Sequence, residues 1–209
     1  MLAGILPLHL ISFVMMKSAL VQHIQQFVKV PPAALSAICE GMTLETLSKK
    51  DYLLQQDQYC QHQYFILQGC FRCFYINPKG MEQIINFAVE NWWLADFDSL
   101  LNKRASRLNI QALEEAVVLK ITREKLELIL LDHPSLERYF RIIYEKIRIA
   151  DQRRMQFMFD LSGEELYDVF YEANSDFVQR VPQYMLASYL GLTPQFLSKI
   201  RGRKRKNRD

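Results

Sequence analysis

The amino-acid sequence predicts an α+β fold, in which an antiparallel β-roll (a double-stranded β-helix) with flanking helices precedes a long helix and a C-terminal helix-turn-helix unit. Three observations lead to this prediction. Short runs rich in β-branched and aromatic residues follow one another between residues 43 and 121. Apolar residues then recur at 4-3 spacing over residues 134–159. Residues 160–209 hold two short helical segments separated by a glycine.

The composition is that of a globular protein. Half of the 209 residues are hydrophobic and 23% are charged, which excludes a disordered or collagen-like chain. Four cysteines in a chain of this length do not make a disulfide framework, so we expect a reducing, cytoplasmic location.

Residues 1–16 form an apolar N-terminal extension without any Lys, Arg, Asp or Glu. The segment is shorter than the roughly 20 residues that span a membrane, and its first cation, Lys17, follows the apolar run instead of preceding it. Three interpretations stay open: a short docking helix, an extension upstream of a start at Met15 or Met16, and a membrane or export signal.

A sensor domain is expected over residues 17–133. It begins with a helix over 17–30 and a second helix that Pro31 and Pro32 open and that ends near Gly41. Turn residues at 77–80 predict a hairpin. The predicted strands are Tyr52–Leu54, Tyr64–Leu67, Cys70–Ile76, Gln83–Val89, Leu108–Ala112 and Val117–Ile121.

A dimerisation helix is expected over residues 134–159, after a helix that Thr122 caps. The spacing favours a seam between two copies of the chain, although a helix packed on its own domain would give the same pattern. The residues assigned to the seam are Leu136, Phe140, Ile143, Ile147 and Ala150.

The segment Gln183–Ile200 meets the demands of a helix-turn-helix in the domain predicted over residues 160–209. Ala187 is small enough for a close helix crossing, Gly191 tolerates the positive φ of the turn, and Thr193 with Pro194 starts the second helix. Apolar residues fill the space between the two helices. They are Leu186, Leu190, Leu192, Leu197 and Ile200.

Charge is concentrated at the C-terminal end, where residues 199–209 hold seven basic residues and one acid, leaving 19 basic and 22 acidic residues in the rest of the chain. A basic end on an acidic body favours a polyanion partner. With 194–201 as recognition helix, Thr193, Gln195, Ser198 and Lys199 face base edges. The cations assigned to phosphates include Arg201, Arg203 and Lys204.

Over residues 20–205 the chain resembles the Crp/Fnr family of bacterial transcription regulators. Residues 64–69, Tyr-Phe-Ile-Leu-Gln-Gly, are similar to the strand-Gly signature of cyclic-nucleotide-binding domains, and residues 181–200 are similar to the family's helix-turn-helix. The latter, with residues 83–87, Trp92-Trp93, residues 96–99 and residues 110–114, looks like a subgroup from Bacteroidetes-type bacteria. The resemblance implies a homodimer that binds a two-fold symmetric operator in double-stranded DNA. It further implies a small-molecule effector of unknown identity and RNA polymerase as partners, with no membrane partner.

The chain departs from the family at the ligand site. Cyclic-nucleotide binders carry a Gly-Glu pair and, some ten residues on, an Arg followed by Ser or Thr. Here Ala95-Asp96 and Ser106-Arg107 take those places. Because a buried phosphate needs its cation in place, we expect an effector other than a cyclic nucleotide. The candidate pocket comprises Trp93, Asp96, Ser106 and Arg107.

No enzyme activity, cofactor or metal site is expected. The four histidines are scattered, and the chain contains no G-x-S-x-G, P-loop or dinucleotide-binding turn. Cys70 and Cys73 would face opposite sides of a strand, which does not suit a shared metal. Because only a basic tail follows the second helix, one alternative stays open: a ligand- or partner-sensing β-roll module that no longer reads DNA specifically.

Overall fold

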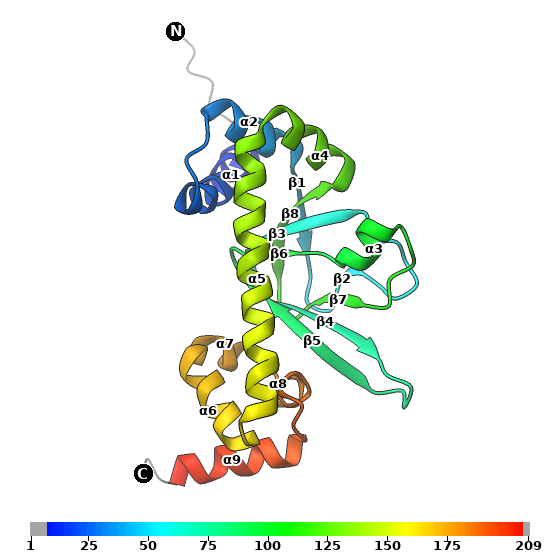
Figure 1. Cartoon of the computed structure of the whole chain (residues 1–209), viewed down its shortest axis with the longest axis vertical. Coiled ribbons are helices and arrows are strands. Elements are labelled where there is room, and N and C mark those ends of the chain that lie inside the picture. The colour runs from blue at the N-terminus through cyan, green and yellow to red at the C-terminus, as the bar shows by residue number, and fades with distance from the viewer. Residues whose placement is uncertain (1–7, 207–209) are drawn as a thin grey trace. The chain divides into compact units, whose positions relative to one another are not determined.

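The structure is a computed structural model that describes the backbone of residues 8–206 and the side chains of residues 18–203 (Figure 1). The predicted fold class is confirmed: antiparallel sheets, a long helix and C-terminal helices are all present. The chain forms two compact units, one of residues up to 71 with 88–144, the other of residues 72–87 with 145 onward. These bounds differ from the predicted domains, because residues 72–87 cluster with the C-terminal helices.

The first unit begins with helix α1, Leu8–Phe27, which starts within the apolar segment assigned to an extension. No glycine or proline interrupts residues 8–27, so this part of the segment continues the helix predicted from residue 17. Residues 1–7 lie outside the described residues. Leu20, Ile24 and Val28 are buried, as the helical spacing predicts. The other helices of this unit are α2 (Pro32–Gly41), α3 (Phe97–Asn102) and α4 (Arg123–Asp132).

Strands of the first unit pair in the antiparallel manner of a β-roll. One sheet has the order β1-β8-β3-β6, with strands Thr43–Leu47, Ala116–Thr122, His62–Gln68 and Trp93–Leu94. The strand β2, Tyr52–Leu54, pairs with β7, Asn109–Ala112. Strands β1 and β6 and helix α3 are additions to the predicted elements. Among residues 8–206, no helix is long and apolar enough to cross a membrane.

A buried polar chain links three elements of the first unit. The indole Nε1 of Trp93 donates to the Tyr139 hydroxyl over 2.8 Å, and this hydroxyl lies 2.7 Å from Nδ1 of His23. Tyr139 is fully buried, and Trp93 is 4% exposed. A neutral imidazole can accept the phenol hydrogen, so the Tyr139 hydroxyl both donates and accepts a hydrogen bond in this part of the core.

We expect the first unit to lose stability as pH falls from about 7.5 to 5.5. Burial lowers the pKa of His23 in the folded chain, so the unfolded chain binds its proton at higher pH. The stabilising effect of the neutral imidazole is therefore complete above the ordinary histidine pKa and declines below it. Urea unfolding across this range measures the effect. His23→Asn, which keeps an acceptor and removes the titration, should flatten the curve, whereas an unchanged curve would assign the dependence to another group.

The second unit combines a hairpin with the C-terminal helices. Strands β4 (Phe71–Ile76) and β5 (Glu82–Ala88) are joined by the predicted turn, where the Gly80 N–H donates to the Asn77 carbonyl over 2.8 Å. Helix α5, Pro134–Asp160, continues into this unit. A Ser162–Glu165 capping box starts the next helix, as predicted. The remaining helices are α6 (Gly163–Ala173), α7 (Ser175–Arg180), α8 (Gln183–Leu190) and α9 (Pro194–Lys206).

Three hydrogen bonds tie the hairpin to Ser188 of helix α8. The Ser188 hydroxyl accepts from the Ile84 N–H over 3.0 Å and donates to the Glu82 carbonyl over 3.4 Å, while the Ser188 carbonyl accepts from Gln83 Nε2 over 2.8 Å. The ring of Phe87 packs edge-on against Phe177 and Tyr189. These contacts explain why the hairpin belongs to the second unit.

Candidate functional site

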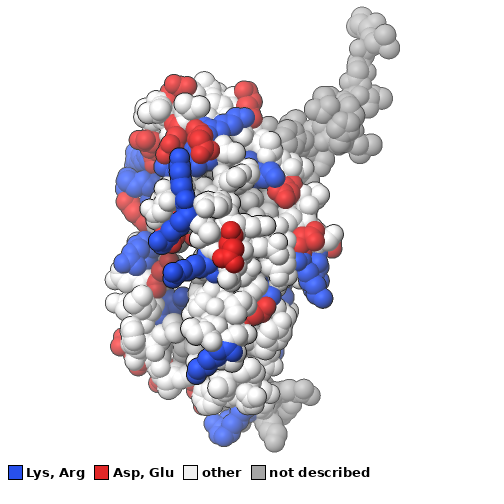
Figure 2. All heavy atoms as spheres, turned by 90° about the vertical axis from the view of Figure 1, so that its right-hand side faces the viewer, with Lys and Arg blue, Asp and Glu red and all other residues white. Residues whose placement is uncertain are grey.

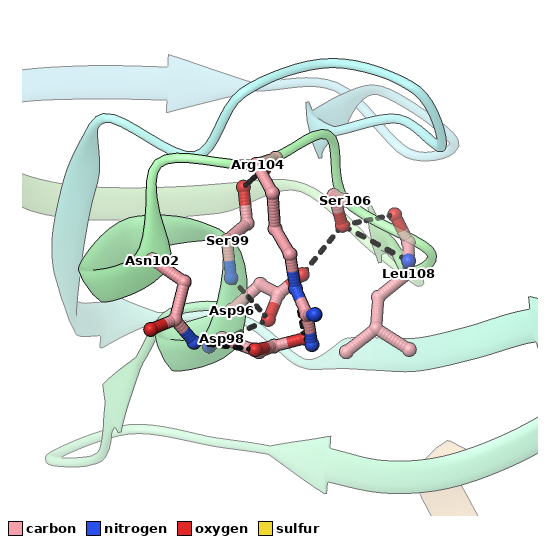
Figure 3. A network of polar contacts seen from close by, with 7 residues as sticks. All are labelled: Asp96, Asp98, Ser99, Asn102, Arg104, Ser106 and Leu108. Atoms are coloured by element: carbon pink, nitrogen blue, oxygen red, sulfur yellow. Dashed lines mark hydrogen bonds and ion pairs between the residues drawn. The ribbon is translucent and has the colours of Figure 1, made fainter.

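Asp96 and Ser106, two of the predicted pocket residues, lie together in the loop around α3 (Figure 3). Asp96 is the N-cap of this helix: Oδ1 accepts from the N–H groups of Asp98 and Ser99 over 3.1 and 3.3 Å. Oδ2 accepts from the Ser106 hydroxyl over 2.6 Å, and the same hydroxyl accepts from the Leu108 N–H over 2.9 Å. Both carboxylate oxygens are therefore occupied by groups of the chain itself.

The rest of this loop is closed in the same way. The Ser99 hydroxyl accepts from the Cys60 N–H over 2.9 Å and donates to the Arg104 carbonyl over 2.6 Å. The Arg104 guanidinium pairs with Asp98, and its hydrogen bond lowers the pKa of that carboxyl group. Arg107 is exposed. Both arginines are exposed and Arg104 is engaged by Asp98, whereas Asp96 is buried.

Trp93, the third residue of the predicted pocket, does not take part in the hydrogen bonds around Asp96. Trp93 donates its indole N–H to Tyr139 and packs against the rings of Phe65 and Phe140, with centroids 5.4 and 5.0 Å away. Its side chain therefore belongs to the helix-covered face of the sheet. The loop network engages Asp96 and Ser106, whereas Trp93 is bonded to Tyr139 and Arg107 is exposed. Within residues 18–203, no group of His, Cys, Asp and Glu side chains is arranged to hold a metal ion.

Helices α8 and α9 have the local structure that the sequence predicts. Gly191 adopts φ +69°, the left-handed conformation of the turn, and the Leu192 N–H donates to the Ala187 carbonyl over 2.9 Å. The Thr193 hydroxyl caps α9 by accepting from the Phe196 N–H over 3.2 Å. Leu192 is partly buried. The residues buried between these helices and their neighbours are Leu186, Ala187, Leu190, Leu197 and Ile200.

The opposite side of α9 is polar and exposed. Its exposed residues include Thr193, Gln195, Ser198, Lys199, Arg201 and Arg203, all assigned to DNA from the sequence. The side chain of Lys204 lies outside the described residues. Helix α9 runs to Lys206, beyond the predicted end at residue 201. Nη1 of Arg203 lies 3.6 Å from the Glu164 carboxylate of α6, an exposed pair that contributes little to stability.

Two exposed aromatic residues of this helix pair were not assigned to a base-reading role from the sequence. Tyr184 on α8 is 54% exposed and Phe196 on α9 is 42% exposed. Residue type alone would predict a buried side chain at Phe196, because phenylalanines are most often buried. Elsewhere charges of both signs mix: on the face in Figure 2, Lys and Arg side chains lie among Asp and Glu side chains.

The predicted dimer seam needs correction. Leu136, Phe140 and Ile143 are 0%, 3% and 7% exposed and belong to the core of the first unit. They are therefore not available to a partner helix, and the alternative of a helix packed on its own domain holds for this part of α5. Ile147 is partly buried and Ala150 is exposed. The exposed large apolar residues of α5 lie in its second half: Ile149, Met155, Phe157, Met158 and Phe159.

Arg154 of α5 contacts α8 within the second unit. Its guanidinium stacks on the Tyr189 ring, 4.5 Å from the centroid, and Nη1 donates to the Tyr189 carbonyl over 3.2 Å. This carbonyl belongs to the last turn of α8, where a cation also complements the helix dipole.

Beside the same helix, a groove of about 340 Å³ separates the hairpin from the start of α9. Its lining comprises Asn77, Met81, Glu82, Gln83, Ile84, Tyr184, Ser188, Leu192, Thr193 and Pro194.

Comparison with known proteins agrees with this architecture. Residues 44–133 match the family model of the cyclic nucleotide-binding domain. No curated protein matches the chain. Among solved structures, FixK2 from Bradyrhizobium japonicum matches with a TM-score of 0.69 at 16% identity, covering 79% of this chain and 85% of that one.

Two further structures are similar over most of their length. The c-di-GMP responsive global regulator CLP of Xanthomonas campestris matches with a TM-score of 0.68 at 10% identity, covering 85% of this chain and 93% of the other. A CooA mutant from Carboxydothermus hydrogenoformans matches with a TM-score of 0.62 at 16% identity, covering 80% and 78%. The chain therefore shares its fold with these three proteins.

Proposed function

We propose that the chain is a DNA-binding transcription regulator of the Crp/Fnr type, in which α9 reads a two-fold symmetric operator as part of a homodimer. The observation that carries this proposal is the helix pair itself. Its inner side is fully apolar, whereas the outer side of α9 exposes an amide, a hydroxyl and several cations. A helix with this division matches the demands of the major groove, and the solved structures of like fold include a global regulator.

The exposed residues divide into two roles. Gln195 in the first turn suits the N6 and N7 atoms of adenine, and Lys199 one turn later suits the acceptors of guanine. Arg201 and Arg203 lie further along α9, where they are suited to phosphates. Phosphate contacts fix the register of the helix, while the contacts of Gln195 and Lys199 select the sequence.

A second copy of the chain is the partner proposed for the second half of α5. The exposed side chains there include Met155 and Phe159, which are 55% and 82% exposed. Exposed apolar side chains at this density are typical of an interface. Because Leu136 and Phe140 lie in the core of the first unit, the proposed contact is confined to the residues from Ile147 onward. Two copies would then place two α9 helices in successive major grooves, about 34 Å apart.

The β-roll is not expected to bind cyclic nucleotides. A cyclic phosphate needs a cation beside it, but Ser106 stands at the sequence position of the family's arginine, and its hydroxyl donates to Asp96 over 2.6 Å. Cyclic AMP or cyclic GMP is added at about 1 mM, which is on the order of the Kd of a weak ligand. The melting temperature should stay unchanged, because a nucleotide that does not bind does not stabilise the folded chain. A rise of several degrees with either nucleotide would contradict this assignment. An effector of another class, and RNA polymerase as a partner, stay predictions.

The proposed roles predict different effects of two substitutions in α9. Selection of bound fragments from genomic DNA supplies the operator, and binding is then measured on this operator and on random DNA. Gln195→Ala should weaken operator binding by about 1–3 kcal/mol and leave random DNA unaffected. Arg201→Ala should weaken both alike and reduce the slope of log K against log salt by about one.

Arg138→Ala provides the matched control, because Arg138 is an exposed cation of α5 in the first unit. It should change neither binding constant. Equal effects of Gln195→Ala and Arg201→Ala on both kinds of DNA would contradict the division of roles. Failure of the unmodified chain to select any sequence would instead favour a sensing module that no longer reads DNA.

A further inference from the structure

We infer that Phe196 is a specificity-determining residue of α9, whose ring contacts the C5-methyl group of a thymine in the major groove. The inference rests on the proposed function and adds to it a base that the polar residues of α9 do not read. Its starting point is that α9 has three large apolar residues, of which Leu197 and Ile200 are 0% and 1% exposed while Phe196 is 42% exposed. Packing between the two helices therefore does not explain why an apolar side chain is exposed at Phe196.

Phe196 lies where a recognition helix meets the bases. Thr193 is the N-cap of α9, so Phe196 belongs to the first helical turn, directly after the exposed Gln195. Lys199 follows three residues later, which places it next to Phe196 on the helix surface. The ring therefore has the cation proposed to read base edges as a neighbour on the helix surface, and the amide precedes it in the same turn.

One edge of this ring packs against helix α6. A Cβ atom at Gly163, the first residue of α6, would lie 2.7 Å from Cε1 of Phe196 and 2.7 Å from Cδ2 of Leu192. The ring therefore rests close to the Gly163 backbone, and the Phe196 N–H donates to the Thr193 hydroxyl. One edge of the ring thus packs against the protein, which reduces the conformational entropy that the ring loses when the other edge meets a ligand.

The chemistry of the major groove narrows what this edge can contact. The thymine C5-methyl is the apolar group that base pairs present there, and phenylalanine is among the side chains that contact it. The neighbouring Gln195 suits adenine, so these two side chains together favour A·T pairs at adjacent positions of each half-site. An exposed phenylalanine contributes nothing to phosphate binding, which sets its role apart from that of Arg201.

Replacement of thymine by deoxyuridine tests this inference without altering the protein. Each thymine of the selected operator half-site is replaced in turn, which removes one methyl group and leaves base pairing intact. The unmodified chain should lose about fourfold in affinity at one position per half-site, the effect expected for one buried methyl group. Phe196→Ala should bind the thymine operator more weakly and should be insensitive to deoxyuridine at that position.

Gln195→Ala is the matched control, since it removes the neighbouring contact and should keep the full sensitivity to deoxyuridine. Circular dichroism of Phe196→Ala checks its helix content, and Phe196→Leu, which retains an apolar side chain, should keep part of the sensitivity. The inference is overturned if the unmodified chain tolerates deoxyuridine at every position, or if Phe196→Ala is as sensitive as the unmodified chain. In both cases selective binding of the operator would persist, so the proposed function would stand, whereas absence of operator binding would refute the proposed function itself.

Discussion

Leu197→Ala is expected to unfold the helix pair and to abolish DNA binding while the β-roll stays folded. Leu197 is completely buried among Leu186, Ala187 and Leu190, on the inner side of α9. Removing a leucine from such a site costs about 2–5 kcal/mol, because the lost contacts leave a cavity. Small domains have only about 5–15 kcal/mol of stability in total, so this loss is a large fraction for the second unit.

Hydrogen exchange measured by mass spectrometry separates the two units. Peptides from α6, α8 and α9 should exchange much faster in Leu197→Ala, whereas peptides from β3 and β8 should be unchanged. Leu131→Ala serves as the control, because Leu131 is 74% exposed and its removal should alter stability by less than about 0.5 kcal/mol. Uniformly faster exchange in both units would show that they unfold together and would contradict their separate stability.

The helix pair was predictable because its determinants are local. A small residue at the crossing, a glycine in the turn and a capped second helix lie within 18 residues of sequence, from Gln183 to Ile200. In the structure Ala187 is buried, Gly191 adopts the left-handed conformation and the Thr193 hydroxyl caps α9. Predicted caps at Thr122 and Ser162 are confirmed for the same reason, since a cap involves only residues three apart.

Elements that depend on distant partners were missed. Strand β6 has only two residues, Trp93 and Leu94, and is defined by its pairing with β3. Strand β1 carries Glu45 among its five residues, a composition that does not indicate a strand. The Glu45 side chain pairs with Lys120 of β8 over 2.7 Å, a contact between residues far apart in the sequence. Local pattern cannot reveal such a contact.

The two candidate sites also differ in how far their structure depends on local sequence. For α9, helical periodicity already separates the inner from the outer positions, so exposed residues could be named from the sequence. For the loop around α3, the sequence identified Asp96 and Ser106 but not that they bond to each other, which closes the site. The seam of α5 failed because 4-3 spacing describes any helix with one apolar face, whether its cover is a second chain or its own unit.

Gly69→Ala is expected to destabilise the β-roll by about 2–6 kcal/mol, since backbone strain and overpacking each cost roughly 1–3 kcal/mol. Gly69 adopts φ +103°, a conformation that residues with a side chain rarely take. An added Cβ would lie 2.6 Å from Cβ of Ala116, 2.9 Å from its Cα and 3.0 Å from the Glu115 carbonyl oxygen. Two of these atoms are backbone, so the clash cannot be relieved by a side-chain rotation.

Gly80→Ala isolates the conformational part of this effect. Gly80 also has a positive φ, +75°, but an added Cβ would meet nothing within 4 Å. This variant should lose only about 1–2 kcal/mol, the cost of the left-handed conformation alone. Urea unfolding of both variants gives the comparison, and the difference between them measures the close approach of Gly69 to β8. Equal losses would mean that the strand shifts to admit a methyl group, and the glycine that ends the Tyr64–Gly69 signature would then be required only for its backbone conformation.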